Sequence, residues 1–211
     1  MTTLRSVESV ADVIADVIAG ASAGRSRTIA GITGPPGAGK STIAARVVNR
    51  LGSTAVLLGL DGFHLPQSRL VALGRRERMG APDTFDVDGF VALLSRLHNA
   101  GAVVLAPGFD REIEEPVPDA LALSPAIRAI VAEGNYFLHG SGGWERVAPL
   151  LDATFFVRVD HDIRLARLIE RHVRFGKSLA DARAWATGPD ERNARLIEAT
   201  AGRADHTIEL D

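Results

Sequence analysis

Short apolar runs alternate along the chain with segments in which apolar residues recur every three or four positions. Runs of strand length occupy Thr28–Thr33, Thr54–Leu60, Ala102–Ala106, Ala126–Ala132, Thr154–Val159 and His206–Leu210. Helical spacing occupies Leu4–Ala19, Ser41–Leu51, Phe90–His98, Trp144–Leu151, Asp162–Phe175 and Leu179–Ala201, the last with a break near Gly188-Pro189. Strands that alternate with helices predict an α/β fold, with a mostly parallel sheet between two helical layers.

Two segments lack this periodicity. Phe63 to Pro82 carries a basic cluster at Arg75, Arg76 and Arg78. A solvated loop and an anion-binding lobe are equal alternatives for this cluster. The segment Glu112 to Pro125 is rich in proline and acidic residues, and we expect it to be an exposed excursion.

Length and charge narrow the class of protein. The 211 residues fit one α/β domain, so we expect a single domain over residues 1–211. The formal net charge is -2, which argues against nucleic acid as a partner. Without cysteine there is no disulfide framework, and the acidic residues Glu8, Asp12 and Asp16 argue against a signal peptide or a membrane-inserted segment. A cytoplasmic location is expected.

One glycine-rich stretch carries the most specific signal. Gly34 to Ser41 reads G-x-x-x-x-G-K-S and joins a predicted strand to a predicted helix, as a phosphate-binding loop does. Backbone N–H groups and the helix N-terminus would hold a triphosphate, Lys40 would reach its β- and γ-phosphates, and the Ser41 hydroxyl would coordinate Mg²⁺. The residues expected to bind ATP are Gly34, Pro35, Pro36, Gly37, Ala38, Gly39, Lys40, Ser41 and Thr42. Residues 28–41 therefore predict a P-loop NTPase fold.

Three carboxylates follow predicted strands. Asp61, Asp110 and Glu133 come at or shortly after the ends of apolar runs, and the carboxyl ends of parallel strands meet at one edge of a sheet. Their convergence would supply a Mg²⁺ site and a general base. We expect Glu133 near the metal with Ser41, and Asp61 as the base with a further contact to the metal. His64 is an alternative base, or a structural or substrate-contacting residue.

The helix predicted from Asp162 carries a row of cations. Arg164, Arg167, Arg171 and Arg174 are spaced three or four residues apart and so share one face. We favour a mobile helical lid, about residues 162–178, over a solvated face. In that interpretation Arg167 and Arg171 contact the transferring phosphoryl group and act as catalytic residues with Lys40 and Asp61.

The order of motifs resembles one superfamily. Gly34 to Ser41 is followed by Asp61-Gly62-Phe63-His64, by Arg78 to Asp86, by Pro107-Gly108-Phe109-Asp110-Arg111, and by Glu133-Gly134-Asn135-Tyr136. This series resembles the uridine kinase, type I pantothenate kinase and phosphoribulokinase superfamily. The chain looks closest to small bacterial proteins called nucleoside/nucleotide kinase-like, some labelled fructose transport system kinases.

The resemblance implies roles for individual residues. It implies Asp61 as the catalytic carboxylate, Glu133 near Mg²⁺ and Asn193 beside the adenine of ATP. It places Asp110 and Arg111 in the acceptor pocket, and we expect further acceptor contacts from His64, Arg78 and Tyr136. The chain is shorter than a typical pantothenate kinase, and Phe63-His64 differs from the Phe-Tyr of uridine kinases, so the acceptor is left open.

These observations predict an ATP-dependent kinase that phosphorylates a hydroxyl of a small metabolite. A fructose-like sugar is the first choice, with pantothenate or a nucleoside as alternatives. A GTPase-type switch would need an Asn-Lys-x-Asp motif, and none of the asparagines Asn49, Asn99, Asn135 and Asn193 begins one. A non-catalytic nucleotide-binding regulator is a remote alternative, because Lys40, Ser41, Asp61 and Glu133 are all present. Homodimerisation is left open.

Overall fold

The computed structural model describes residues 6–22, 26–99 and 101–210. A parallel sheet of five strands, in the order β2-β5-β1-β6-β7, forms its centre. Its strands are β1 (Thr28–Thr33), β2 (Ala55–Gly59), β5 (Ala129–Glu133), β6 (Ala153–Val159) and β7 (His206–Leu210). Every residue of β1 and β5 is buried, as expected for central strands covered on both faces.

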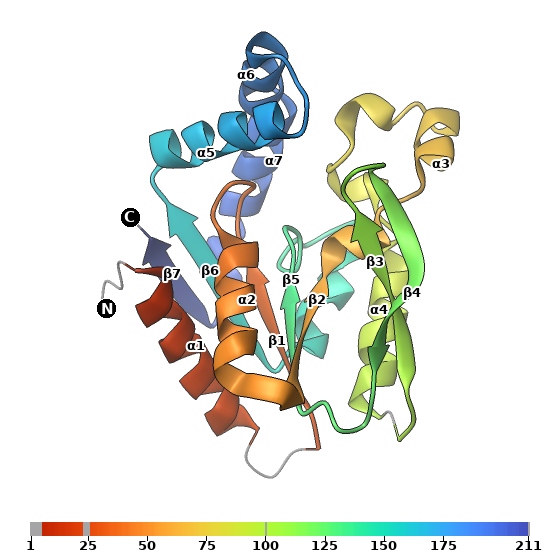
Figure 1. Ribbon diagram of the computed structural model, residues 1–211, viewed down its shortest axis with the longest axis vertical. Coiled ribbons are helices and arrows are strands. Elements are labelled where there is room, and N and C mark those ends of the chain that lie inside the picture. The colour runs from red at the N-terminus through yellow and green to blue at the C-terminus, as the bar shows by residue number, and fades with distance from the viewer. Residues whose placement is uncertain (1–5, 23–25, 100, 211) are drawn as a thin grey trace.

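Helices cover both faces of this sheet (Figure 1). One face packs against α1 (Val7–Ala21) and α2 (Lys40–Leu51), and the other packs against α4 (Val87–His98) and α7 (Pro189–Glu198). Side chains alternate between the two cores along each strand, so Ile29 faces α4 while Ala30 faces α2. The predicted layered α/β fold is therefore confirmed.

The remaining helices lie above the carboxyl edge of the sheet or beside it (Figure 1). They are α3 (Gln67–Ala72), α5 (His161–Arg174) and α6 (Leu179–Thr187). The helical break predicted near Gly188-Pro189 separates α6 from α7. The Asp86 side chain caps α4 by accepting a hydrogen bond from the Gly89 amide. The segment predicted as one short helix after Trp144 instead forms two 3₁₀ turns, Trp144–Arg146 and Ala148–Leu150.

Two predicted segments in the middle of the chain pair with each other and do not join the central sheet. The run predicted at Ala102–Ala106 forms a longer strand, β3 (Val104–Asp110), which lies outside the central sheet. The predicted excursion is also a strand, β4 (Glu115–Leu123), paired antiparallel with β3. Prolines are tolerated in β4 because the sheet has two strands and leaves one edge of each without a partner strand.

A buried arginine ties three segments together below the sheet. Arg27 donates from Nε to Ile127 O at 3.0 Å, from Nη1 to Leu97 O at 3.0 Å and from Nη2 to Ser124 O at 2.8 Å. Leu97 lies in the last turn of α4, and Ser124 and Ile127 follow β4, so one guanidinium joins the start of β1 to both. No helix in the described part of the chain is long and apolar enough to cross a membrane.

Candidate active site

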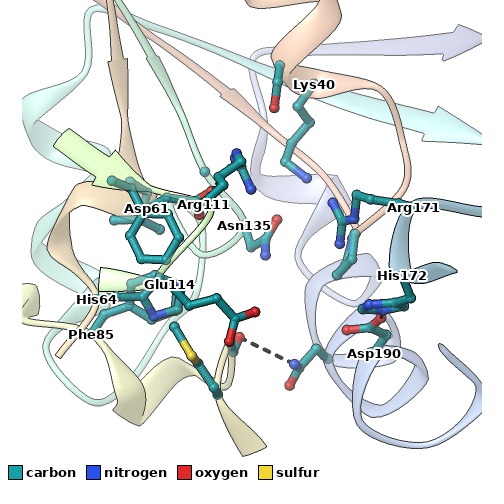
Figure 2. A pocket seen from close by; sticks show the side chains of 18 of the residues that line it. Lys40, Asp61, His64, Phe85, Arg111, Glu114, Asn135, Arg171, His172 and Asp190 are labelled. Carbon is teal, nitrogen blue, oxygen red and sulfur yellow. Dashed lines mark hydrogen bonds and ion pairs between the residues drawn. The ribbon is translucent and has the colours of Figure 1, made fainter. Parts of the chain in front are cut away.

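A pocket opens at the carboxyl edge of the sheet, where the loop between β1 and α2 faces two other walls (Figure 2). Pro36, Lys40, Ser41 and Glu133 form the loop side. The hairpin side is formed by Asp61, His64, Phe85, Phe109, Arg111 and Glu114. The helical wall is formed by Arg171, His172, Lys177, Trp185, Asp190 and Asn193. Segments from most of the chain therefore meet at one place.

The loop from Gly34 to Ser41 has the backbone of an anion cradle. Gly37 and Gly39 have φ of 84° and 87°, in the left-handed region, and Gly39 is the N-cap of α2. A Cβ on Gly37 would lie 2.8 Å from Arg164 O, so this position has no room for a side chain. A loop that turns in this way before a helix N-terminus presents N–H groups to phosphate oxygens.

Lys40 is the buried cation of this loop. Its side chain folds back, and Nζ donates to Pro35 O at 3.0 Å. Burial lowers the pKa of Lys40 to about 8, and the nearby Glu133 carboxylate opposes that shift. A triphosphate in the cradle would offer this ammonium a stronger partner than one carbonyl oxygen.

Ser41 and Glu133 form the second polar pair at the loop. Ser41 Oγ donates to Glu133 Oε1 at 3.2 Å. Burial raises the pKa of Glu133, and the Asp61 carboxylate raises it further. A buried carboxylate beside a hydroxyl is a fitting donor set for Mg²⁺, which takes few protein ligands and completes its shell with phosphate oxygens and water.

The expected meeting of three carboxylates does not occur. Within residues 6–22, 26–99 and 101–210, no group of three or more His, Cys, Asp or Glu side chains is arranged to hold a metal ion. Asp61 and Glu133 share the pocket, whereas Asp110 is not among the residues that line it. Asp110 Oδ1 instead accepts from the Glu112 amide at 2.8 Å, because the chain turns there towards β4.

Asp61 lies in a 3₁₀ turn, Leu60–Phe63, directly after β2. Its Oδ2 accepts from Arg111 Nη2 at 2.6 Å. His64 follows this turn and stacks on Phe85, with ring centroids 4.0 Å apart. Burial lowers the pKa of His64, which keeps the ring neutral near pH 7. Asp61 therefore supplies a carboxylate on this side of the pocket, and His64 forms part of its wall.

Four other predicted site residues lie away from the pocket lining. Arg78 pairs with Asp83 at 2.5 Å, and the buried Tyr136 donates from its hydroxyl to Gly80 O at 2.6 Å. Thr42 is exposed on α2 and Arg167 is exposed on α5. None of the four is among the lining residues of this pocket, so their side chains would have to move into the pocket to act as predicted.

The row of arginines on α5 is divided by burial. Arg164 is 1% exposed and pairs with Glu191 of α7, whereas Arg171 lines the pocket. The four arginines were expected to share one face of this helix, but burial gives Arg164 and Arg171 different surroundings. The buried pair anchors the first half of α5, and only its second half reaches the pocket.

Several lining residues were not among the predicted site residues, although Arg76 belongs to the basic cluster noted in the sequence. His172 Nε2 lies 2.7 Å from Asp190 Oδ2, which joins α5 to α7 across residues that are 18 positions apart. Arg76 pairs with Glu114 at 3.0 Å across the hairpin side. Asn193, expected beside adenine, lines the pocket and donates to Gly80 O at 3.3 Å. Only the series of motifs could have indicated this region, and it did not single out Arg76, Glu114 or Asp190.

Comparison with known proteins assigns the family. The profile of the Phosphoribulokinase / Uridine kinase family matches residues 29–184. The ATP-dependent kinase-like protein notR' of Aspergillus versicolor is 42% identical over 125 residues, which are 56% of this chain and 73% of that protein. A uridine kinase of Leuconostoc citreum is 34% identical over 149 residues, covering 69% of this chain and 68% of its own.

A solved structure agrees with these sequence matches. A protein of Silicibacter sp. TM1040, described as a candidate fructose transport system kinase, superposes with a TM-score of 0.80 and 35% identity. The match covers 86% of this chain and 89% of that one. The chain therefore belongs to the phosphoribulokinase/uridine kinase family and has the P-loop kinase fold.

Proposed function

We propose that this protein is an ATP-dependent kinase that transfers the γ-phosphoryl group of ATP to a hydroxyl of a small metabolite. The observation that carries the proposal is that Lys40, Ser41, Glu133 and Asp61 line one pocket. Family membership and the names of the relatives support ATP as the donor. The likeness to a candidate fructose transport system kinase supports a sugar as the acceptor, before pantothenate or a nucleoside.

The loop side would bind the nucleotide. Backbone N–H groups of Gly34 to Ser41 would hold the phosphates, and Lys40 would leave Pro35 O for the β- and γ-phosphates. Ser41 and Glu133 would hold Mg²⁺, which neutralises charge on the phosphates. Arg171 would stabilise negative charge on the group in transfer, and Arg167 would join it only if the second half of α5 moved towards the loop.

The hairpin side would bind and activate the acceptor. Asp61 would accept the proton of the attacking hydroxyl while its orientation is kept by Arg111. Arg111 and His64 would contact the rest of the acceptor, with Asp110 fixing the turn that carries Arg111. A non-catalytic regulator would have no need for a carboxylate facing the phosphate loop in this way.

Acceptor-dependent release of ADP tests the proposal. The purified protein would be given ATP, Mg²⁺ and, one at a time, sugars, nucleosides and pantothenate. We expect at least one acceptor to raise ADP release well above the background hydrolysis, and its phosphorylated product to be found by mass spectrometry. Background hydrolysis with every acceptor, together with intact ATP binding, would favour the regulatory alternative.

A further inference from the structure

Glu114 is held in an unusual backbone conformation at the turn between β3 and β4. Its φ is 53°, in the left-handed region that disfavours residues with a side chain. Contacts with α3 fix this position. The Gln67 side chain donates from Nε2 to Glu114 O at 3.0 Å. The Gln67 backbone N–H donates to the carboxylate of the neighbouring Glu115 at 3.2 Å. The backbone is therefore constrained where this side chain begins.

The constraint directs the Glu114 carboxylate into the pocket. Figure 2 shows its side chain extending between His64 and the part of the helical wall that carries Asp190. Glu114 Oε2 accepts from Arg76 Nη2 at 3.0 Å. Its side chain is 51% exposed, so the carboxylate can meet a molecule that enters the pocket.

The cations of the hairpin side are already paired with carboxylates. Arg76 pairs with Glu114, and Arg111 pairs with Asp61 at 2.6 Å. Across the pocket, Asp190 adds a third carboxylate, which pairs with His172. To pair with Arg76 or Arg111, an acceptor with its own carboxylate or phosphate would have to displace Glu114 or Asp61. Hydroxyl groups can bond to carboxylate oxygens and to guanidinium N–H groups without breaking the pairs.

We propose that Glu114 makes the site select acceptors by charge. The site then binds an uncharged, hydroxyl-rich molecule and excludes acceptors with a carboxylate or phosphate. This inference rests on the proposed function and narrows its acceptor class. It favours a free sugar or a nucleoside over pantothenate, which carries a carboxylate. Specificity then comes from repulsion of the wrong partner as well as attraction of the right one.

Pairs of acceptors that share hydroxyl groups and differ in charge provide the test. Pantothenate would be compared with pantothenyl alcohol, and hexoses with their aldonic acids. For each compound, kcat/KM would be measured from ADP release, and binding from calorimetry with a non-hydrolysable ATP analogue present. In the wild type we expect the neutral member of each productive pair to be preferred. In Glu114→Gln we expect the ratio of anionic to neutral kcat/KM to rise roughly tenfold, the scale of one like-charge contact near a protein surface.

Two further variants complete the design. Glu112→Gln removes the same charge from an exposed neighbour outside the pocket lining and should leave the ratio unchanged. Arg76→Gln leaves Glu114 without its guanidinium and should lower the ratio. If thermal melting shows that Glu114→Gln is unfolded, the ratio of anionic to neutral kcat/KM in Arg76→Gln still tests the role of Glu114.

The outcomes separate the two proposals. Preference of the wild type for anionic acceptors, or an equal shift in Glu114→Gln and Glu112→Gln, would overturn the role of Glu114 and leave the kinase activity standing. Neutral acceptors that bind in preference but never raise ADP release would overturn the kinase activity and leave the charge selection standing. If no compound binds or reacts, both proposals fail.

Discussion

Asp61 and Asp110 make a matched pair of carboxylates for a test of the proposed base. Both were expected at the edge of the sheet, but only Asp61 lines the pocket. Asp61→Asn keeps the shape of the side chain and removes its ability to accept a proton. We expect kcat to fall by about a hundredfold or more, since a general base contributes roughly 10²–10⁴ to the rate.

The substitution should change little else. The Asp61 and Arg111 side chains are 35% and 50% exposed, and an exposed ion pair contributes only about 0–1 kcal/mol to the free energy of unfolding. The groups expected to hold the nucleotide, Lys40, Ser41 and Glu133, are unchanged. Affinity for ATP, measured by displacement of a fluorescent nucleotide, should therefore stay close to that of the wild type.

Asp110→Asn is the control. An asparagine Oδ1 can still accept from the Glu112 amide, so the turn is kept and kcat should stay near the wild-type value. A kcat for Asp61→Asn within a few-fold of the wild type would remove Asp61 from the role of base. An equal loss in both variants would show that turnover depends on negative charge along this edge and not on proton transfer to Asp61.

Three further predictions concern the loop and the fold. Lys40→Ala should slow turnover and weaken ATP binding by roughly ten- to a hundredfold, the range expected for loss of one charge-assisted hydrogen bond. Equilibrium binding of ATP and kcat would be measured, and unchanged values would contradict the assignment of the phosphate loop. Gly37→Ala should lower the free energy of unfolding by about 1–3 kcal/mol, because its φ is 84° and the added Cβ would meet Arg164 O at 2.8 Å; thermal melting measures it, and an unchanged melting temperature would refute the strain. Arg27→Met should lower the free energy of unfolding, measured in urea, by about 3 kcal/mol, because three carbonyl groups lose their hydrogen-bond donor. A decrease below about 1 kcal/mol would show that water replaces the guanidinium.

Much of the fold was predictable because its central strands carry a strong local signal. β1 and β5 are buried on both faces and so read as continuous apolar runs, and the glycine-rich loop has a fixed spacing. The sequence did not reveal β4. Its prolines and charged residues resemble an exposed loop, since a strand in a two-stranded sheet is buried less completely than a central one.

The position of a pocket residue was predictable where it lies at or just after the end of a strand, as with Asp61 and Glu133. It was not predictable where the role depends on packing between distant segments. Helical spacing placed Arg164 and Arg171 on one face. Only the structure shows that Arg164 is buried and forms an ion pair with Glu191. Glu114 belongs to no motif. Its position depends on the turn between β3 and β4, and β4 was not predicted to be a strand.

The separate sheet of β3 and β4 has a consequence for the proposed acceptor site. The chain leaves the central layer after α4 and returns to it at β5, and among the described strands the hairpin of β3 and β4 pairs with no strand of the central sheet. Its tip carries Arg111 and Glu114, while the phosphate loop lies on the other side of the pocket. Under the proposed function, exchange of this hairpin between relatives should change which acceptor is preferred and leave ATP binding intact, because the hairpin and the phosphate loop are separate parts of the pocket.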